Sequence, residues 1–229
     1  MHFARSILIP LLALIAVPAA AEIGYETVEI QEIVTDAGSE RLVEALAPAP
    51  LPRSIAAYGP FRVIDNTRAA LVDVTDEAAP DQFTAMLRDF PGIALLEMVE
   101  CPGTEDDRAN LRLGRMIHRL GITTHVPAGG SVRSGGVELF LAGARRIADP
   151  GAEFAVHSWA DEDGREPGDY AVDAPENRAY LDYYREMGMS LSQAAEFYAM
   201  TNSVPNAEAK WLGAEDMAHW VKLDQARFP

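Results

Sequence analysis

Between residues 60 and 224 the spacing of hydrophobic positions changes back and forth between strand-like and helix-like. Short apolar and β-branched runs predict strands at 61–64, 69–74, 93–99, 122–126, 146–148 and 153–157, with a last strand near 220–223. Hydrophobic residues three and four apart predict helices at 80–90, 104–120, 134–142, 175–188, 190–200 and 214–218. The alternation predicts an α/β domain with a mostly parallel sheet and right-handed crossovers.

Polar residues mark the starts of two of these helices. The run 104–107 (TEDD) and the pair Ser190 and Gln193 both have capping-box character. The segment 134–142 is nearly all apolar, so we expect a buried helix there.

The N-terminal residues have the pattern of an export signal. Arg5 precedes an apolar stretch at 6–17, and Ala19–Ala21 supplies a small-residue cleavage site. We therefore expect a signal peptide at 1–21, a lead-in at 22–58 that includes a Pro- and Ala-rich piece at 45–52, and a domain at 59–229. The apolar stretch is too short to cross a bilayer, so no membrane span is expected after cleavage. The expected location is periplasmic or secreted.

Composition narrows the function classes. Lys and Arg number 19 against 35 Asp and Glu, a formal net charge of −16, which argues against nucleic-acid or anionic-lipid surfaces. Cys101 is the only cysteine, so no intramolecular disulfide can form, and its apolar surroundings favour a buried thiol. The sequence has no glycine-rich loop followed by a lysine, so it gives no sign of a nucleotide-binding site. The spacing of His118 and His125 fits no usual zinc pattern, and we expect no metal and no cofactor.

Three loops that follow predicted strands carry candidate chemistry. They hold Gly103 after the strand at 93–99, Ser134 at the start of the buried helix, and His157 at the end of the strand at 153–157. In parallel sheets such loops meet outside the carboxyl ends of the strands, where ligands bind. A serine beside a histidine base is the arrangement of a serine nucleophile, and the N–H groups of Gly103 and Gly135 are candidate oxyanion donors. The plainer alternatives are a helix-capping serine and a structural histidine.

These segments resemble a known family. The runs at 130–159, 100–121 and 210–224 are similar to the Clp protease proteolytic subunit, and more closely to exported Clp-like proteins of the Clp/crotonase superfamily. The resemblance implies a Clp/crotonase-like α/β fold with a mostly parallel sheet, ββα repeats and flanking helices. It implies Ser134 as nucleophile, His157 as general base, and Gly103 and Gly135 as oxyanion donors. It also implies a peptide or protein substrate and a homo-oligomer.

The chain departs from the family pattern at several positions. Ala209 stands where the Clp subunit has the triad acid, and Glu208 and Asn206 are two nearby candidates for orienting His157. Arg133, directly before the serine, is unusual; it either stabilises an anionic substrate or faces solvent. A Ser-Lys dyad is disfavoured, because both lysines, at 210 and 222, lie far past the serine.

Further positions near the expected site stay open. Glu138, one helical turn after Ser134, either acts on His157, meets an oligomer partner or sits at a helix edge. The acidic run at 161–169 is a solvated loop or a lid. The aromatic residues of the last long helices, at 180, 183, 184, 197 and 198, form a packing stripe or line a substrate groove.

Two functions follow from these observations. The first is an exported Clp-like serine hydrolase, of peptidase type and independent of ATP, that uses Ser134 and His157. The alternative is a catalytically inactive Clp-like fold that acts as a periplasmic binding or assembly module.

Overall fold

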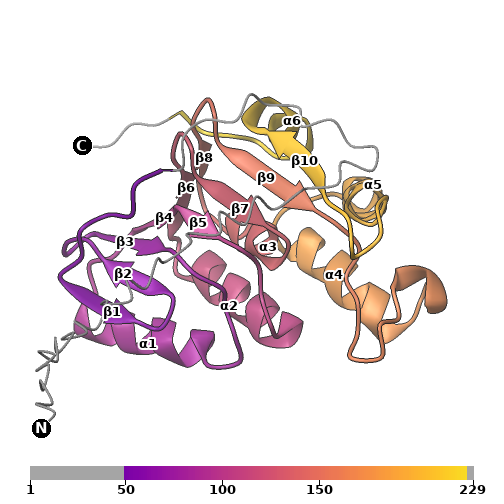
Figure 1. The fold of residues 1–229 in the computed structure, drawn as a ribbon, viewed down its shortest axis with the longest axis horizontal. Coiled ribbons are helices and arrows are strands. Elements are labelled where there is room, and N and C mark those ends of the chain that lie inside the picture. Colours follow the sequence, from indigo (N-terminus) through magenta and orange to yellow (C-terminus); the bar gives the residue numbers. More distant parts are fainter. Residues whose placement is uncertain (1–48, 226–229) are drawn as a thin grey trace, which may run out of the picture. The chain divides into compact units, whose positions relative to one another are not determined.

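A computed structural model describes residues 49–225 of the chain. The expected signal peptide at 1–21 and nearly all of the expected lead-in at 22–58 lie outside the described residues. Figure 1 shows two sheets with helices packed around them.

The first sheet has six strands in the order β1-β2-β3-β4-β6-β8. The strands are β1 (Ala56–Tyr58), β2 (Phe61–Val63), β3 (Arg68–Leu71), β4 (Leu95–Met98), β6 (Thr123–Val126) and β8 (Arg146–Ala148). The first three run antiparallel, and β3, β4, β6 and β8 are parallel.

The second sheet has four strands in the order β10-β9-β7-β5. These are β5 (Glu100–Cys101), β7 (Ser131–Arg133), β9 (Glu153–Val156) and β10 (Lys210–Gly213). The strands β5, β7 and β9 are parallel, and β10 closes the sheet antiparallel to β9. The ends of these short strands carry the three loops with candidate chemistry.

Six α-helices accompany the sheets within residues 49–225. They are α1 (Ala79–Asp89), α2 (Asp107–Arg119), α3 (Gly135–Leu141), α4 (Pro175–Glu186), α5 (Leu191–Thr201) and α6 (Ala214–Trp220), and a 3-10 turn lies at Pro167–Asp169. Helix α2 is capped by Asp106, whose side chain accepts from the N–H of Ala109 at 2.8 Å. Helix α5 begins with the capping box expected at Ser190 and Gln193.

The predicted α/β fold with a mostly parallel sheet is confirmed, but several elements differ from the prediction. The strands β1, β5, β7 and β10 were not predicted, because pieces of two to four residues with polar members give no readable alternation. β1 forms from the end of the expected lead-in and pairs with β2. The strand predicted near 220–223 is wrong: α6 continues to Trp220, and no strand follows in 221–225.

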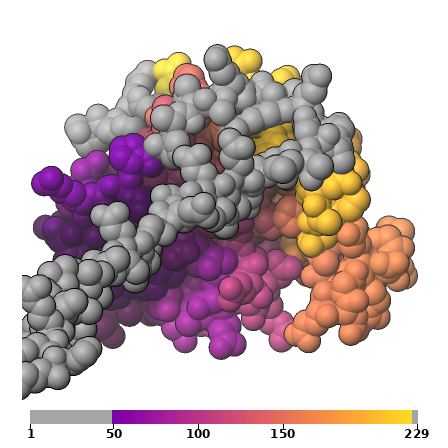
Figure 2. All heavy atoms as spheres, in the orientation of Figure 1, coloured from indigo at the N-terminus to yellow at the C-terminus, as the bar shows by residue number. Residues whose placement is uncertain are grey.

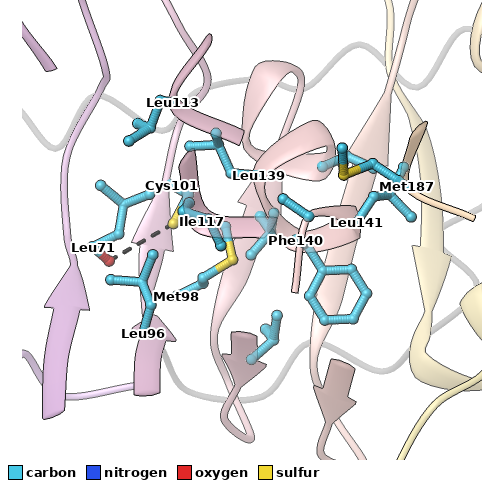
Figure 3. Packing of buried hydrophobic residues seen from close by; sticks show 14 of the residues in the cluster. Leu71, Leu96, Met98, Cys101, Leu113, Ile117, Leu139, Phe140, Leu141 and Met187 are labelled. Carbon is cyan, nitrogen blue, oxygen red and sulfur yellow. Dashed lines mark hydrogen bonds between the residues drawn. The ribbon is translucent and has the colours of Figure 1, made fainter. Parts of the chain in front are cut away.

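The hydrophobic core lies between the sheets and the helices packed on them, and it extends to Tyr183 of α4 and Phe197 of α5. Figure 3 shows part of it. Every residue of α3 is buried, as its apolar sequence predicted. Cys101 is buried as expected, 1% exposed, and its thiol lies 3.7 Å from the carbonyl of Leu71. Burial raises the pKa of this thiol, so it is a packing residue with little thiolate.

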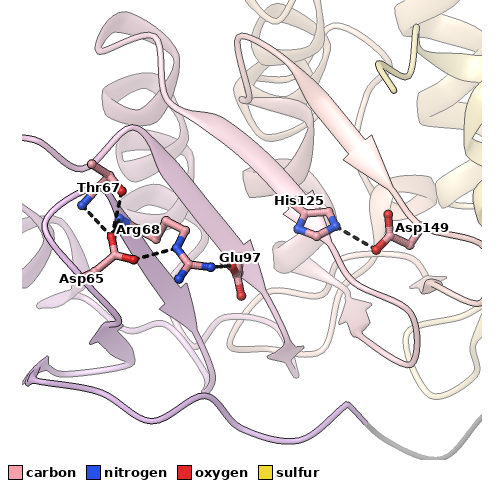
Figure 4. A network of polar contacts seen from close by, with 6 residues as sticks. All are labelled: Asp65, Thr67, Arg68, Glu97, His125 and Asp149. Carbon is pink, nitrogen blue, oxygen red and sulfur yellow. Dashed lines mark hydrogen bonds and ion pairs between the residues drawn. The ribbon is translucent and has the colours of Figure 1, made fainter. Parts of the chain in front are cut away.

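Polar contacts outside the pocket explain two of the histidines, and Figure 4 shows the first of them. His125 Nε2 lies 3.0 Å from a carboxylate oxygen of Asp149, and in the same sheet Arg68 joins Asp65 to Glu97. His118 Nδ1 lies 3.2 Å from the carbonyl of Ala142. Both histidines therefore hold elements together. In the part of the chain that the structure describes, no helix is long and apolar enough to cross a bilayer.

Candidate active site

A pocket of about 160 Å³ opens where the loops of the second sheet meet α2, α3, α4 and α5. Ser134 and His157, 23 positions apart in the chain, both line it. Its other lining residues are Thr104, Asp107, Gly135, Glu138, Val156, Trp159, Ala160, Tyr180, Tyr184, Tyr198, Thr201, Asn202 and Asn206. The structure thus brings the predicted serine and histidine to one cavity.

Ser134 occupies the turn between β7 and α3 in an unusual backbone conformation. Its φ is 48° and its ψ is −128°, and it is the only non-glycine residue with positive φ among residues 49–225. Such a conformation costs about 1–3 kcal/mol and is typical of serines displayed on sharp strand-to-helix turns. The N–H of Ser134 donates to the carbonyl of Ala155 at 2.9 Å, which fixes the turn on β9.

The helix-cap alternative for Ser134 does not fit this geometry. Although the residue stands at the N-cap position of α3, its side chain makes no capping hydrogen bond. The hydroxyl is therefore available to the pocket.

Gly103 lies against Ser134. A Cβ built on this glycine would be 3.0 Å from Ser134 Cβ and 3.5 Å from its Oγ, and the glycine φ of 135° is one that other residues rarely adopt. Among the described residues, the N–H groups of Gly103 and Gly135 have no hydrogen-bond acceptor. Two unpaired donors beside a hydroxyl are what an oxyanion site needs.

Two residues that the sequence analysis missed hold the glycine loops. Asn110 Nδ2 donates to the carbonyl of Gly135 at 2.7 Å, and the Thr75 N–H donates to the carbonyl of Gly103 at 3.1 Å. The Thr75 hydroxyl in turn donates to Asn110 Oδ1 at 3.0 Å. Both side chains are 1% exposed. Asn110 could have been found from the sequence, since it lies within the hydrophobic spacing of the helix predicted at 104–120. A buried amide there needs hydrogen-bond partners.

The ring nitrogen Nδ1 of His157 lies within hydrogen-bond distance of two neighbouring groups. This nitrogen lies 2.8 Å from the carbonyl oxygen of Ser158, which can only accept. This contact fits the tautomer that carries its proton on Nδ1 and leaves the lone pair on Nε2. No hydrogen bond joins the Ser134 hydroxyl to His157 in the part of the chain that the structure describes.

An amide side chain lies next to His157. Asn206 Nδ2 donates to the carbonyl of Ser158 at 2.8 Å and lies 3.3 Å from His157 Nδ1. The Asn206 N–H donates to Glu166 of the acidic loop at 2.8 Å. Glu208 is exposed, and its carboxylate forms no hydrogen bond or ion pair with the described residues. Of the two candidates, the structure brings only Asn206 to the histidine.

Two carboxyl groups also line the pocket. Glu138 is 6% exposed, and its Oε1 accepts from the Tyr184 hydroxyl at 2.7 Å. Burial raises the pKa of Glu138 to about 7; the Asp107 charge adds to this, and the Tyr184 hydrogen bond opposes it. Asp107 is the first residue of α2. Desolvation by the surrounding protein raises the pKa of the Asp107 carboxyl, although Asp107 as a whole residue is exposed. A hydrogen bond from Tyr180 opposes this rise.

The remaining candidates are placed around the pocket. Arg133 does not line it, because its guanidinium donates to Ser131 at 2.8 Å and pairs with Glu100 at 2.5 Å. The acidic loop is held by hydrogen bonds to Asp161, and with α4 it forms the orange region at the lower right of Figure 2. The aromatic stripe divides: positions 180, 184 and 198 line the pocket, and positions 183 and 197 are buried in the core.

Comparisons with known proteins give limited similarity. No protein-family model matches the chain, and no curated protein matches it. One solved structure, a lysine-to-alanine mutant of the 1510-N membrane-bound stomatin-specific protease with a substrate peptide, is 16% identical with a TM-score of 0.42, covering 66% of this chain and 74% of that one. A serine-to-alanine mutant of the same protease is 15% identical with a TM-score of 0.46, covering 69% and 77%. At this similarity the site is interpreted from its own geometry.

Proposed function

We propose that this protein is a serine hydrolase of peptidase type, with Ser134 as nucleophile and His157 as general base. The observation that carries the proposal is the strained turn at Ser134, which presents an uncapped hydroxyl to the pocket that His157 lines, next to two unpaired N–H groups. The N-terminal pattern of 1–21 supports the further proposal that the enzyme acts outside the cytoplasm.

The reaction follows from the proton positions. The Ser134 hydroxyl attacks the substrate carbonyl carbon and gives its proton to His157 Nε2, which holds the free lone pair. The carbonyl oxygen becomes an oxyanion that accepts from the N–H groups of Gly103 and Gly135. The bond to the leaving amine breaks as the imidazolium returns the proton to the nitrogen. Water, deprotonated by the same imidazole, then releases the acyl group and restores the serine.

The carbonyl of Ser158 takes the place of a triad carboxylate in this scheme. It accepts the His157 Nδ1–H and is held by the Asn206 amide, so the ring is oriented with Nε2 free. A carbonyl dipole stabilises the imidazolium less than a full charge does, so we expect slower turnover than in a Ser-His-Asp enzyme.

Labelling with a fluorophosphonate probe tests the assignment. The unaltered protein is expected to be labelled covalently, and Ser134→Ala is expected to lose the label completely; Ser131→Ala, in the preceding strand, is the matched control. Equal labelling of the Ser134→Ala variant contradicts the assignment. Absence of labelling in the unaltered protein favours the alternative function, a binding or assembly module, whose supporting observation is that Ser134 and His157 are not hydrogen-bonded here.

Asn206 is proposed as a positioning residue. Asn206→Asp brings a negative charge next to the imidazole, which stabilises the imidazolium form. The acidic limb of the kcat profile is therefore expected to move up by about one pH unit. Asn66→Asp, in the exposed turn between β2 and β3, is the control and should leave the profile in place. An unmoved profile for Asn206→Asp, with kcat merely scaled, indicates a structural role only.

A further inference from the structure

Two carboxyl groups in the pocket beside Ser134 have no positively charged partner among the residues that the structure describes. Glu138 and Asp107 both line it, and its lining residues include no Lys or Arg. Neither carboxyl takes part in an ion pair among residues 49–225. A buried carboxylate without a cation is costly, so a positively charged ligand would gain more here than at an exposed carboxylate.

Aromatic rings form the rest of the wall. Tyr180, Tyr184 and Tyr198 come from α4 and α5, and Trp159 comes from the loop after β9. The rings of Trp159 and Tyr180 are stacked with centroids 6.2 Å apart. Aromatic faces attract ammonium and guanidinium groups, and they also pack against the methylene stems of such side chains.

The size of the cavity suits one side chain. A cavity of about 150 Å³ holds a benzene molecule, and this pocket is about 160 Å³. Glu138 stands one helical turn beyond Ser134 on α3, so a group that reaches this carboxyl enters next to the hydroxyl.

Resting on the proposed function, we propose that this cavity is the specificity pocket of the enzyme and selects substrates with a Lys or Arg side chain next to the scissile bond, with Glu138 as the principal recognition group and Asp107 as the second. The proposal concerns recognition and adds no chemical step. Removal of either carboxylate weakens the preference without changing the nucleophile.

Binding to the Ser134→Ala variant tests the pocket apart from catalysis. Benzamidine and its neutral isostere benzamide are titrated at pH 8, above the pKa of Glu138 of about 7. Benzamidine is expected to bind at least about tenfold more tightly than benzamide, because the charge-assisted bond is made only by the cation. Glu138→Gln in the same background should remove most of that ratio, and Asp107→Asn part of it. Glu196→Gln, exposed on α5, is the matched control and should not change it.

Turnover by the enzyme with Ser134 intact tests whether the pocket binds a substrate side chain or a free amine. Peptide substrates with arginine or its neutral analogue citrulline beside the scissile bond are compared, and arginine is expected to give at least about a tenfold higher kcat/KM. A protein that prefers benzamidine but shows no such substrate preference binds a free amine, which overturns the proposal. A protein labelled at Ser134 that binds both probes equally also overturns it, while the proposed hydrolase stands. Tight benzamidine binding without labelling overturns the hydrolase and leaves a cation-binding pocket.

Discussion

His157→Ala is expected to lower kcat for an activated ester by about 10³–10⁶-fold, the range seen when the base of a serine hydrolase is removed. Without the imidazole, no group in the described pocket accepts the Ser134 proton at neutral pH with the same geometry. KM should change much less, because the ring acts on the nucleophile and not on the bound acyl group. Steady-state kinetics over pH 6–9 measures both constants.

A matched histidine and a chemical rescue make this result specific. His219→Ala replaces an exposed histidine of α6 and should leave kcat within the experimental error of the unaltered enzyme. Added imidazole should restore part of the activity of His157→Ala if a base is what the pocket lacks. A loss of less than about tenfold for His157→Ala would contradict its role as general base.

Glu138→Gln is expected to stabilise the protein at pH 8 by as much as about 3 kcal/mol and to have little effect near pH 4.5. The folded protein holds the Glu138 proton to a pKa of about 7, above the ordinary value of 4.5. Protonated Glu138 therefore contributes its full stability below about pH 4.5, and this contribution is lost as the pH rises to 7. The glutamine keeps an acceptor for the Tyr184 hydroxyl but has no charge to desolvate.

Urea unfolding at a series of pH values measures the difference in free energy of unfolding between Glu138→Gln and the unaltered protein. Three groups act on Glu138. Tyr184 donates to its carboxyl group and Tyr183 donates to its backbone carbonyl. The charge of Asp107 repels the Glu138 carboxylate. Because Asp107 also titrates, Asp107→Asn in the same series separates the two contributions. A Glu138→Gln stability gain that is the same at pH 5 and pH 8 would show that the carboxyl is not the titrating group.

The same carboxyl gives a physical reason to connect stability with recognition. A buried acid without a cation destabilises the free protein at neutral pH, and binding of a positively charged group relieves that cost. Glu138→Gln is thus expected to gain stability and lose selectivity together, the usual trade-off at binding sites.

Much of the local structure was predictable because hydrophobic spacing reports burial directly. The buried helix α3, the amphipathic helix α2 and the parallel strands of the first sheet all follow from runs of apolar residues at regular intervals. The division into two sheets was not predictable. It depends on β5, β7 and β10, whose two to four residues pair through backbone atoms and leave no periodic pattern.

The sequence by itself determined the chemical groups available to this protein: a serine and a histidine in loops beside predicted strands of a parallel sheet, glycines where the backbone must approach closely, and an acidic balance. Only the tertiary structure decided how they are used, because hydrogen-bond partners come from distant segments. The amide of Asn206 reaches the carbonyl next to His157, which the adjacent Glu208 does not, and α4 and α5 close the pocket around Glu138. Orientation of a side chain and desolvation of a charge both arise from neighbours brought together by folding, so no local pattern records them.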